Sequence, residues 1–319
     1  MRLLPPLLLA ALGQLATAAP ALLSGLVENY ASKPPVYQLV RIADDGSLTA
    51  VDNCTLPHGI MSGITAPSAG TWWATPPFAD QATFGLYLLN VTSSSQTNVL
   101  ISNPPGCDGA FVVGEMAASD VPGDAIGLLG PTDTRNWLAV AEISPAGGVP
   151  RVRMNLSTEG AGFSALAPSF STFDPAGRTF WFAAAVDGEV LVMAAPLDGP
   201  PNPATLFNAS LTIDALALAW VPALKTVVAF GIVAPPQTYG LQALDRSTRT
   251  WRNLIVWPDT FYLSGLGQIA VDPTGRYVYP VVSDEAGQPT MPVVDATTGK
   301  EVKRIVIKSK VLLADVGFV

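Results

Sequence analysis

The sequence predicts an all-β protein that is assembled from one repeated four-stranded unit. Short runs rich in Val, Leu, Ala, Phe and Trp recur along the chain, separated by clusters of Pro, Gly, Asp and Asn. No long stretch shows the 3.6-residue period of a helix. In addition, the stretch FDPAGRTFWF at 173–182 returns as VDPTGRYVYP at 271–280, which points to a unit repeated along the whole chain.

The first element is an apolar N-terminal segment with the features of a secretory signal peptide. Residues 1–18 contain one Arg, an apolar run and then Ala16-Thr17-Ala18, the small-x-small pattern that signal peptidase cleaves. The run is shorter than the roughly 20 apolar residues of a membrane-spanning helix. We therefore expect a signal peptide over 1–18, one mature domain over 19–319, and a secreted, extracellular protein without membrane insertion. A vacuole or the cell wall remains open as the final destination.

The glycosylation sequons agree with a secreted protein, and the net charge limits the partners that it binds. Four Asn-x-Ser/Thr glycosylation sequons start at Asn53, Asn90, Asn155 and Asn208. The net charge of −8 disfavours nucleic acid as a partner, because no basic patch offsets the negative field. The one basic cluster, Lys303, Arg304, Lys308 and Lys310, has the spacing of the solvated face of a strand.

Two series of turns define the repeated unit. Prolines between two apolar runs stand at Pro67, Pro175, Pro222 and Pro273, and hairpins stand at Asp44, Asn90, Ser144, Asp198, Asp245 and Asp295. Successive hairpins are 46, 54, 54, 47 and 50 residues apart, and each proline precedes its hairpin by 22 or 23 residues. Each unit therefore has strands A to D, with the proline turn between A and B and the hairpin between C and D. One A–B turn without proline is expected near 119–121.

Antiparallel units of this length are the blades of a β-propeller, so six C–D hairpins predict six blades. Extended backward, the offset puts the missing A–B turn near position 21; extended forward, it puts the next one just past the last residue. The C-terminal segment KVLLADVGFV at 310–319 is therefore expected to supply strand A of the blade whose strands B, C and D come from the N-terminus. The aromatic residues of the B strands are expected in the core. They are Trp72, Trp73, Phe180, Trp181, Phe182, Tyr277 and Tyr279.

The DP-x-GR turn with its aromatic strand and the hairpin DATTGKEV at 295–302 resemble blades of the YVTN, NHL and gluconolactonase-like propellers. The resemblance implies the fold and leaves binding modules, dehydrogenase-like domains and lactonases open as functions. Lactonases of this kind hold a divalent ion in the central channel with oxygen ligands, the set that calcium prefers. On this resemblance calcium is the candidate cofactor, unless the carboxylates are solvated loop residues. The candidate ligands are Asp108, Asp214 and Gln268, with Glu159 and Asp315 near them by strand position.

The D–A loops are expected on one face, around the mouth of the channel. They span 52–59, 103–109, 157–163, 210–214, 257–265 and 307–310. Cys54 and Cys107 fall in the first two and are expected to form a disulfide, as cysteine pairs in secreted chains usually do. His58 is the single histidine, and without a G-x-S-x-G elbow it indicates a solvated residue more than a catalyst. The aromatic residues of the fifth loop, Trp257, Phe261 and Tyr262, either stack on a ligand or pack against their own blade.

Two functions follow. In the first, the protein is a monomeric binding module without catalytic residues, whose D–A loop face contacts a protein, peptide or glycan. Its candidate binding residues are His58, Asp108, Glu159, Asp214, Tyr262 and Gln268. In the second, it is a calcium-dependent lactonase or esterase whose channel ion polarises the carbonyl of the substrate. Convergence of three or more of the five candidate ligands at one point would favour the second function.

Overall fold

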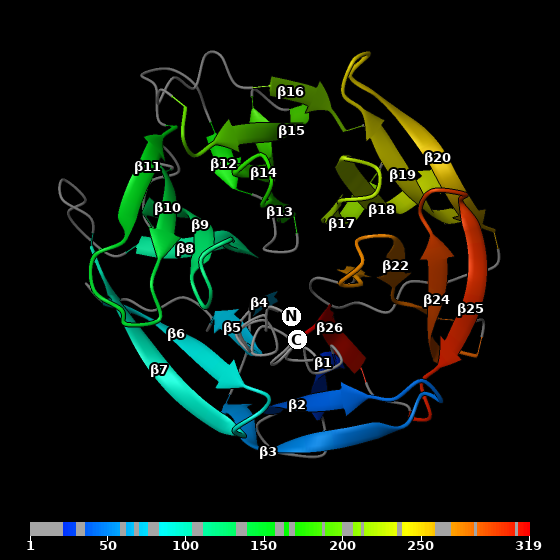
Figure 1. Cartoon of the computed structure of the whole chain (residues 1–319), viewed down its shortest axis with the longest axis horizontal. Helices are drawn as coiled ribbons and strands as arrows, with labels where there is room; N and C mark the ends of the chain where they lie inside the picture. Colours follow the sequence, from blue (N-terminus) through cyan, green and yellow to red (C-terminus); the bar gives the residue numbers. More distant parts are fainter. Residues whose placement is uncertain are drawn as a thin grey trace, which may run out of the picture.

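The computed structural model of the chain forms a ring of six antiparallel sheets (Figure 1). It describes residues 22–29, 36–57, 62–66, 70–75, 83–103, 111–131, 139–156, 163–165, 170–186, 189–199, 207–211, 214–234, 238–258, 269–283, 286–309 and 312–319. These residues contain strands, turns and short connections, and none of them belongs to a helix that could cross a membrane. The protein is thus the six-bladed β-propeller that the repeat predicts.

Blades one to three each consist of four continuous strands, and each strand pairs with its neighbours in the antiparallel direction. Blade one consists of β26 (Leu312–Phe318), β1 (Leu23–Asn29), β2 (Val36–Ile42) and β3 (Leu48–Pro57). Blade two consists of β4 (Ser62–Ala66), β5 (Thr71–Thr75), β6 (Thr83–Asn90) and β7 (Ser95–Ser102). Blade three consists of β8 (Phe111–Ala118), β9 (Ala125–Pro131), β10 (Ala139–Ile143) and β11 (Arg151–Asn155). Its A–B turn between β8 and β9 confirms the turn expected near 119–121.

Blades four and six each divide one strand into two pieces. Blade four consists of β12 (Phe163–Ala165) and β13 (Ser171–Asp174), then β14 (Thr179–Val186), β15 (Glu189–Pro196) and β16 (Phe207–Ser210). Blade five consists of β17 (Asp214–Val221), β18 (Thr226–Ala234), β19 (Thr238–Asp245) and β20 (Thr250–Trp257). Blade six consists of β21 (Ile269–Val271), β22 (Tyr277–Pro280) with β23 (Val282–Ser283), β24 (Pro289–Asp295) and β25 (Lys300–Val306).

The two ends of the chain close the ring, as the turn spacing predicts. Strand β26 pairs with β1, with Leu23 opposite Phe318 and Leu26 opposite Asp315. Beyond the paired strands, the backbone groups of Leu22 and Val319 exchange two hydrogen bonds of 2.8 and 3.0 Å. Closure is therefore made by backbone pairing between residues that are almost the full chain length apart.

The two DP-x-GR turns share one local mechanism. Asp174 accepts hydrogen bonds from the backbone N–H groups of Ala176 and Gly177, at 3.0 and 3.1 Å. In the second copy, the Asp272 carboxylate accepts from the backbone of Thr274, among others. Such turns form from a few consecutive residues, which is why they are visible in the sequence. The copies differ in where the chain enters the left-handed region, at Arg178 in the first and at Gly275 in the second.

Among the described residues, the hydrophobic core consists of six clusters, and each one fills the space between two neighbouring blades. The predicted aromatic residues of the B strands contribute to it: Trp72, Trp73 and Trp181 are fully buried, while Tyr277 and Tyr279 are half-buried. A buried Trp removes about 150–250 Å² from water, which at about 25 cal/mol per Å² stabilises the fold by roughly 4–6 kcal/mol. Each part of the core is therefore formed by two neighbouring blades together.

Polar contacts cross all six boundaries between neighbouring blades. In ring order they join Trp72 to Ser24 (2.8 Å), Trp73 to Gly123 (3.0 Å), Ser171 to Met116 (2.8 Å), Trp220 to Thr172 (2.7 Å), Trp257 to Glu301 (3.0 Å) and Lys308 to Asp45 (2.5 Å). Between blades three and four, Arg178 adds ion pairs with Asp120 and Glu142. These contacts fix the position of each blade relative to its neighbours.

The hairpin of blade six contains a buried carboxylate that is held in its charged form. Asp295 accepts hydrogen bonds from Arg276 Nη2 at 2.5 Å, from Thr297 Oγ1 at 2.6 Å and from the Thr297 backbone at 3.0 Å. The Arg276 guanidinium, followed by the Thr297 hydroxyl, keeps the pKa of this carboxyl well below its usual range. The guanidinium also lies over the ring of Tyr277.

This carboxylate makes stability depend on pH. The pKa of Asp295 is lower in the folded than in the unfolded chain, where it is about 3.9, so the unfolded chain binds more protons between the two values. Its contribution is therefore present above about pH 4 and is lost as the pH falls toward the folded pKa. Urea unfolding from pH 7 to pH 3 should show wild type more stable than Asp295→Asn, with a gap that shrinks in acid. A gap that stays constant with pH would contradict this assignment.

Candidate functional site

The structure describes the side chain of one of the five candidate channel ligands. Asp315 lies on β26, the innermost strand of blade one, and is buried. Asp214 begins β17, and its side chain lies outside the described residues. Asp108, Glu159 and Gln268 also lie outside the described residues. Whether the five residues converge at one point therefore stays a prediction.

The Asp315 carboxylate accepts a hydrogen bond from the backbone N–H of Val316 at 2.7 Å. A calcium ion takes about six to eight oxygen ligands, and one carboxylate cannot supply them. Among the described residues, no group of three His, Cys, Asp or Glu side chains is placed to hold a metal ion. We therefore derive no metal-dependent step from these residues.

The candidate residues on the loop face are also described only in part. His58, Phe261 and Tyr262 lie outside the described residues. Trp257 ends β20, is buried in the cluster between blades five and six, and donates its indole N–H to Glu301 Oε2 at 3.0 Å. For Trp257, packing against the propeller is the correct alternative, and stacking on a ligand is not.

Cys54 corrects one prediction, its place in a D–A loop. It lies inside β3 instead of in a D–A loop, and it is buried between blades one and two as a free thiol. Its Sγ faces the backbone carbonyls of Ser95 and Asn90, at 3.6 and 3.9 Å, and burial raises the pKa of the thiol. The structure shows no disulfide among the described residues, and Cys107 lies outside them, so the pairing of Cys54 with Cys107 stays a prediction.

The physical reason is a bulge that lets the last strand of blade one continue. Gln38 pairs with Thr55, but Val40 pairs with Ala50, so β3 carries extra residues between these pairs. The side-chain amide of Gln38 donates to the Val51 carbonyl at 2.8 Å, and its Oε1 accepts from Thr55 Oγ1 at 2.6 Å. A side chain on the neighbouring strand thus satisfies the bulged backbone, and the sequence of 52–57 alone carries no sign of this.

The four sequons occupy different environments. Asn53 lies within β3, and its side chain is not among those described. Asn90 is half-buried, and its Oδ1 accepts hydrogen bonds from the backbone of Thr92 and Ser93, at 3.0 and 2.7 Å. Asn155 and Asn208 are exposed on the outer strands β11 and β16.

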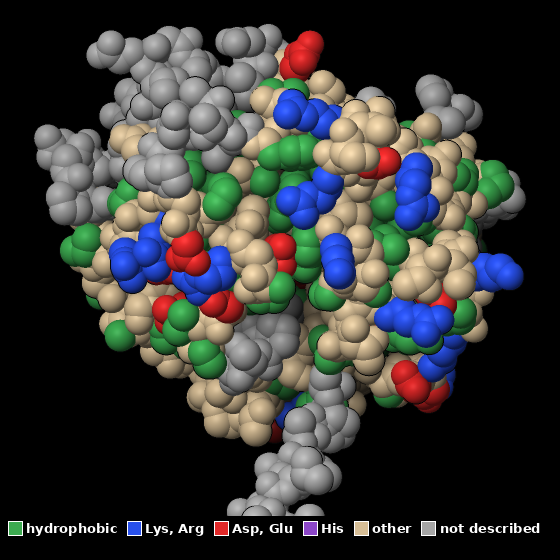
Figure 2. All heavy atoms as spheres, turned by 45° about the horizontal axis from the view of Figure 1, so that its top comes forward, with side chains coloured by type: hydrophobic (Ala, Val, Ile, Leu, Met, Phe, Trp, Pro, Cys, Tyr) green, Lys and Arg blue, Asp and Glu red, His purple; other side chains and the backbone are tan. Residues whose placement is uncertain are grey.

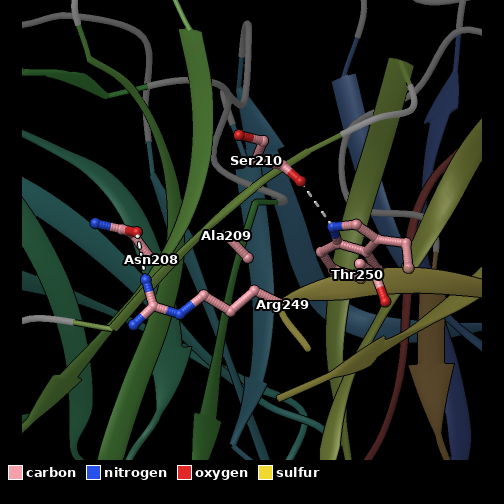
Figure 3. A pocket seen from close by; sticks show the side chains of 6 residues that line it. Asn208, Ala209, Ser210, Arg249 and Thr250 are labelled. Carbon is pink, nitrogen blue, oxygen red and sulfur yellow. Dashed lines mark hydrogen bonds between the residues drawn. The ribbon is translucent and has the colours of Figure 1, made fainter. Parts of the chain in front are cut away.

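The sequence reasoning missed a groove between the outer strands of blades four and five (Figure 3). It has a volume of about 360 Å³. Three residues come from β16 and three from the C–D turn and β20: Asn208, Ala209, Ser210, Arg249, Thr250 and Trp251. The sequon at Asn208 was the available signal, but its neighbours are about 40 residues away in the chain.

Arg249 reaches across the boundary between the two blades. Its backbone adopts the left-handed conformation with φ of 59°, and its guanidinium lies 5.3 Å from the centre of the Phe207 ring. Its Nη1 donates to Asn208 Oδ1 at 3.3 Å, while Trp251 Nε1 donates to the Ser210 carbonyl at 3.0 Å. A guanidinium, hydroxyls, an amide and an indole side by side suit a polar ligand with apolar faces, such as a saccharide.

The surface around the ring carries charges of both signs. Acidic side chains lie beside basic ones at several places on the face shown in Figure 2. Arg178, for example, pairs with both Asp120 and Asp198, and Lys303 pairs with Asp44. Lys303 and Arg304 are exposed on β25 as predicted, whereas Lys308 lies beyond that strand and Lys310 lies outside the described residues.

No family model matches the sequence, and no curated protein matches it. Solved structures do match the fold. TolB from Acinetobacter baumannii aligns with a TM-score of 0.59 at 12% identity, covering 93% of this chain and 66% of TolB. A putative 6-phosphogluconolactonase from Bacteroides uniformis aligns with a TM-score of 0.55 at 12% identity, covering 94% of this chain and all of that one. A further one, from Bacteroides fragilis, aligns with a TM-score of 0.52 at 12% identity, covering 96% and 100%.

These similarities establish the architecture. The chain has the fold of TolB-like and 6-phosphogluconolactonase-like propellers, in agreement with the gluconolactonase-like blade pattern of the sequence. At 12% identity they carry no residue of a site from those proteins to this chain.

Proposed function

We propose that the protein is a secreted binding module, a six-bladed disc whose D–A loop face contacts an extracellular protein, peptide or glycan. The observation that supports this most is the set of polar contacts across all six boundaries between blades, on top of the six shared hydrophobic clusters. Binding loops work when a rigid scaffold holds them, and this ring is such a scaffold.

The connections between strands are divided between the two faces of the disc. On the A–B and C–D face, the described turn at Asp245 is held locally, because its carboxylate accepts from the backbone of Ser247 and Thr248 at 2.8 and 3.3 Å. The opposite face receives the D–A connections, including 103–110 between β7 and β8 and 258–268 between β20 and β21. These two D–A connections supply eight and eleven residues to that face for recognition.

Binding is tested on arrays of extracellular glycans and peptides with the secreted protein. We expect saturable binding to a ligand class that Tyr262→Ala loses, because this residue belongs to the proposed face. Ser93→Ala, in the C–D turn of blade two on the other face, should bind like wild type. Loss of binding in Ser93→Ala alone would contradict the assignment of the face.

A calcium-dependent lactonase is the second candidate. It is favoured by the buried Asp315 on an innermost strand and by the fold similarity to proteins named putative 6-phosphogluconolactonases. A binding module that holds no ion has a melting temperature that is the same in EDTA and in calcium. A rise of several degrees on adding calcium, lost in Asp315→Asn, would replace the first candidate by the second.

A further inference from the structure

We propose that Asn208 carries an N-linked glycan and that the groove between β16 and β20 holds its first sugars. The inference rests on the secretory route that the proposed function includes. It assigns the groove a ligand that is bound to the chain itself, an oligosaccharide that begins with N-acetylglucosamine.

The sequon Asn208-Ala-Ser lies in extended conformation on an outer strand. Because side chains alternate along a strand, Asn208 and Ser210 share one face of β16, and both are exposed. Ala209 points to the other face, where it is buried in the cluster between blades four and five. The acceptor amide and the sequon hydroxyl are thus presented together to the solvent, whereas Asn90 is half-buried and uses its amide to hold its own turn.

Arg249 holds the Asn208 amide by its oxygen. Its Nη1 donates to Oδ1, so the amide nitrogen is the atom that remains for the linkage. Glycosylation joins Nδ2 to the anomeric carbon of a lipid diphosphate-linked oligosaccharide. The carbon–oxygen bond to the diphosphate breaks, the diphosphate leaves with the electron pair, and Nδ2 loses one proton. The contact between Arg249 and Oδ1 is compatible with the product, because the oxygen is unchanged.

The groove next to this amide has the size and chemistry for sugar rings. Its volume of about 360 Å³ lies within the range of roughly 300–1,000 Å³ of small-molecule sites. Trp251 packs against the cluster between blades four and five and donates to the Ser210 carbonyl, so the exposed part of its half-buried ring is a fixed apolar surface for a pyranose. Arg249 and Thr250 are exposed beside it and offer polar partners for sugar hydroxyls.

The test uses the full chain secreted from a eukaryotic host. Peptide mapping after enzymatic release in heavy-oxygen water identifies each glycosylated Asn by its mass. The rate of release by peptide N-glycosidase is then measured at Asn208 and at Asn155, in the folded and in the denatured protein. We expect release at Asn208 to be about tenfold slower than at Asn155 in the folded protein, which corresponds to about 1.4 kcal/mol of groove contact, and equal after denaturation.

Arg249→Met is the informative variant, because it keeps the length of an exposed side chain and removes the contact with the amide. It should retain the glycan and bring the release rate at Asn208 to that at Asn155. Equal release rates at Asn208 and Asn155 in the folded wild-type protein would overturn the proposal that the sugars pack in the groove. An unmodified Asn208 beside a glycosylated Asn155 would overturn the site and leave secretion intact. A secreted protein with no sugar at any sequon would overturn only this inference, whereas a failure to be secreted would overturn the proposed function as well.

The alternative to an attached glycan is a free saccharide that binds in the groove through the same contacts. Titration of unglycosylated protein from a bacterial host with the N-acetylglucosamine disaccharide distinguishes the two. We expect no saturation at millimolar concentration, because the covalent link supplies the effective concentration. Micromolar binding, lost in Arg249→Met, would show that the groove is a site for a free saccharide and would overturn the inference.

Discussion

Gly46→Ala is expected to lower the free energy of unfolding by at least about 3 kcal/mol. Gly46 lies in the C–D hairpin of blade one, with φ of +80°, and an added Cβ would stand 1.7 Å from the backbone oxygen of Val306 at the end of blade six. The Gly46 carbonyl also accepts from the Lys308 backbone at 2.9 Å. Because the obstacle is backbone, the two blades would have to move apart.

Gly287→Ala is the control that separates the steric clash at Gly46 from the strain of the left-handed backbone. Gly287 has a similar φ of +73°, but an added Cβ there meets nothing within 4 Å. Its substitution should cost only the left-handed conformation, about 1–2 kcal/mol. Urea unfolding of the two variants measures the difference. Equal losses would show that the contact between blades six and one does not contribute.

Trp72→Ala is expected to lower the free energy of unfolding by about 3–5 kcal/mol. Trp72 is fully buried between blades one and two. Its Nε1 donates to Ser24 Oγ at 2.8 Å, and Ser24 Oγ donates to the Gly317 carbonyl at 3.2 Å. The side chain therefore supports the pairing of β1 with β26 that closes the ring, and its removal leaves both a cavity and a buried hydroxyl with one partner less.

A matched pair of phenylalanine variants isolates the hydrogen bond. Trp181 is as buried as Trp72, but no described residue accepts a hydrogen bond from its Nε1. Both substitutions remove similar volume, so Trp72→Phe should be more destabilising than Trp181→Phe by about 1 kcal/mol or more. Thermal and urea unfolding can be used for the comparison. If Trp181→Phe is the more destabilising, then the ring contacts of Trp181 with Arg246 and Trp220 outweigh the hydrogen bond of Trp72.

The turns explain how much of the fold is predictable from the sequence. Asp174, Asp272 and Asp295 form hydrogen bonds within two to five residues of themselves, so each turn is encoded locally and recurs at the blade period. From that period follow the number of blades, the A–B turn of blade three and the joining of the chain ends. The candidate ligands Asp108 and Gln268 lie in the segments 104–110 and 259–268, outside the described residues, so the loop face stays a prediction from sequence.

The remaining features of the structure depend on contacts between segments that are distant in the sequence. Cys54 was predicted in a loop, but Gln38 on the neighbouring strand satisfies a bulge that carries β3 through it. The groove beside Asn208 exists only because Arg249 and Trp251 of the next blade pack against β16. Local turn chemistry could be recognised from the residue pattern alone. The environment of each side chain between blades depended on which surfaces the closed ring brings together, and only the tertiary structure shows them.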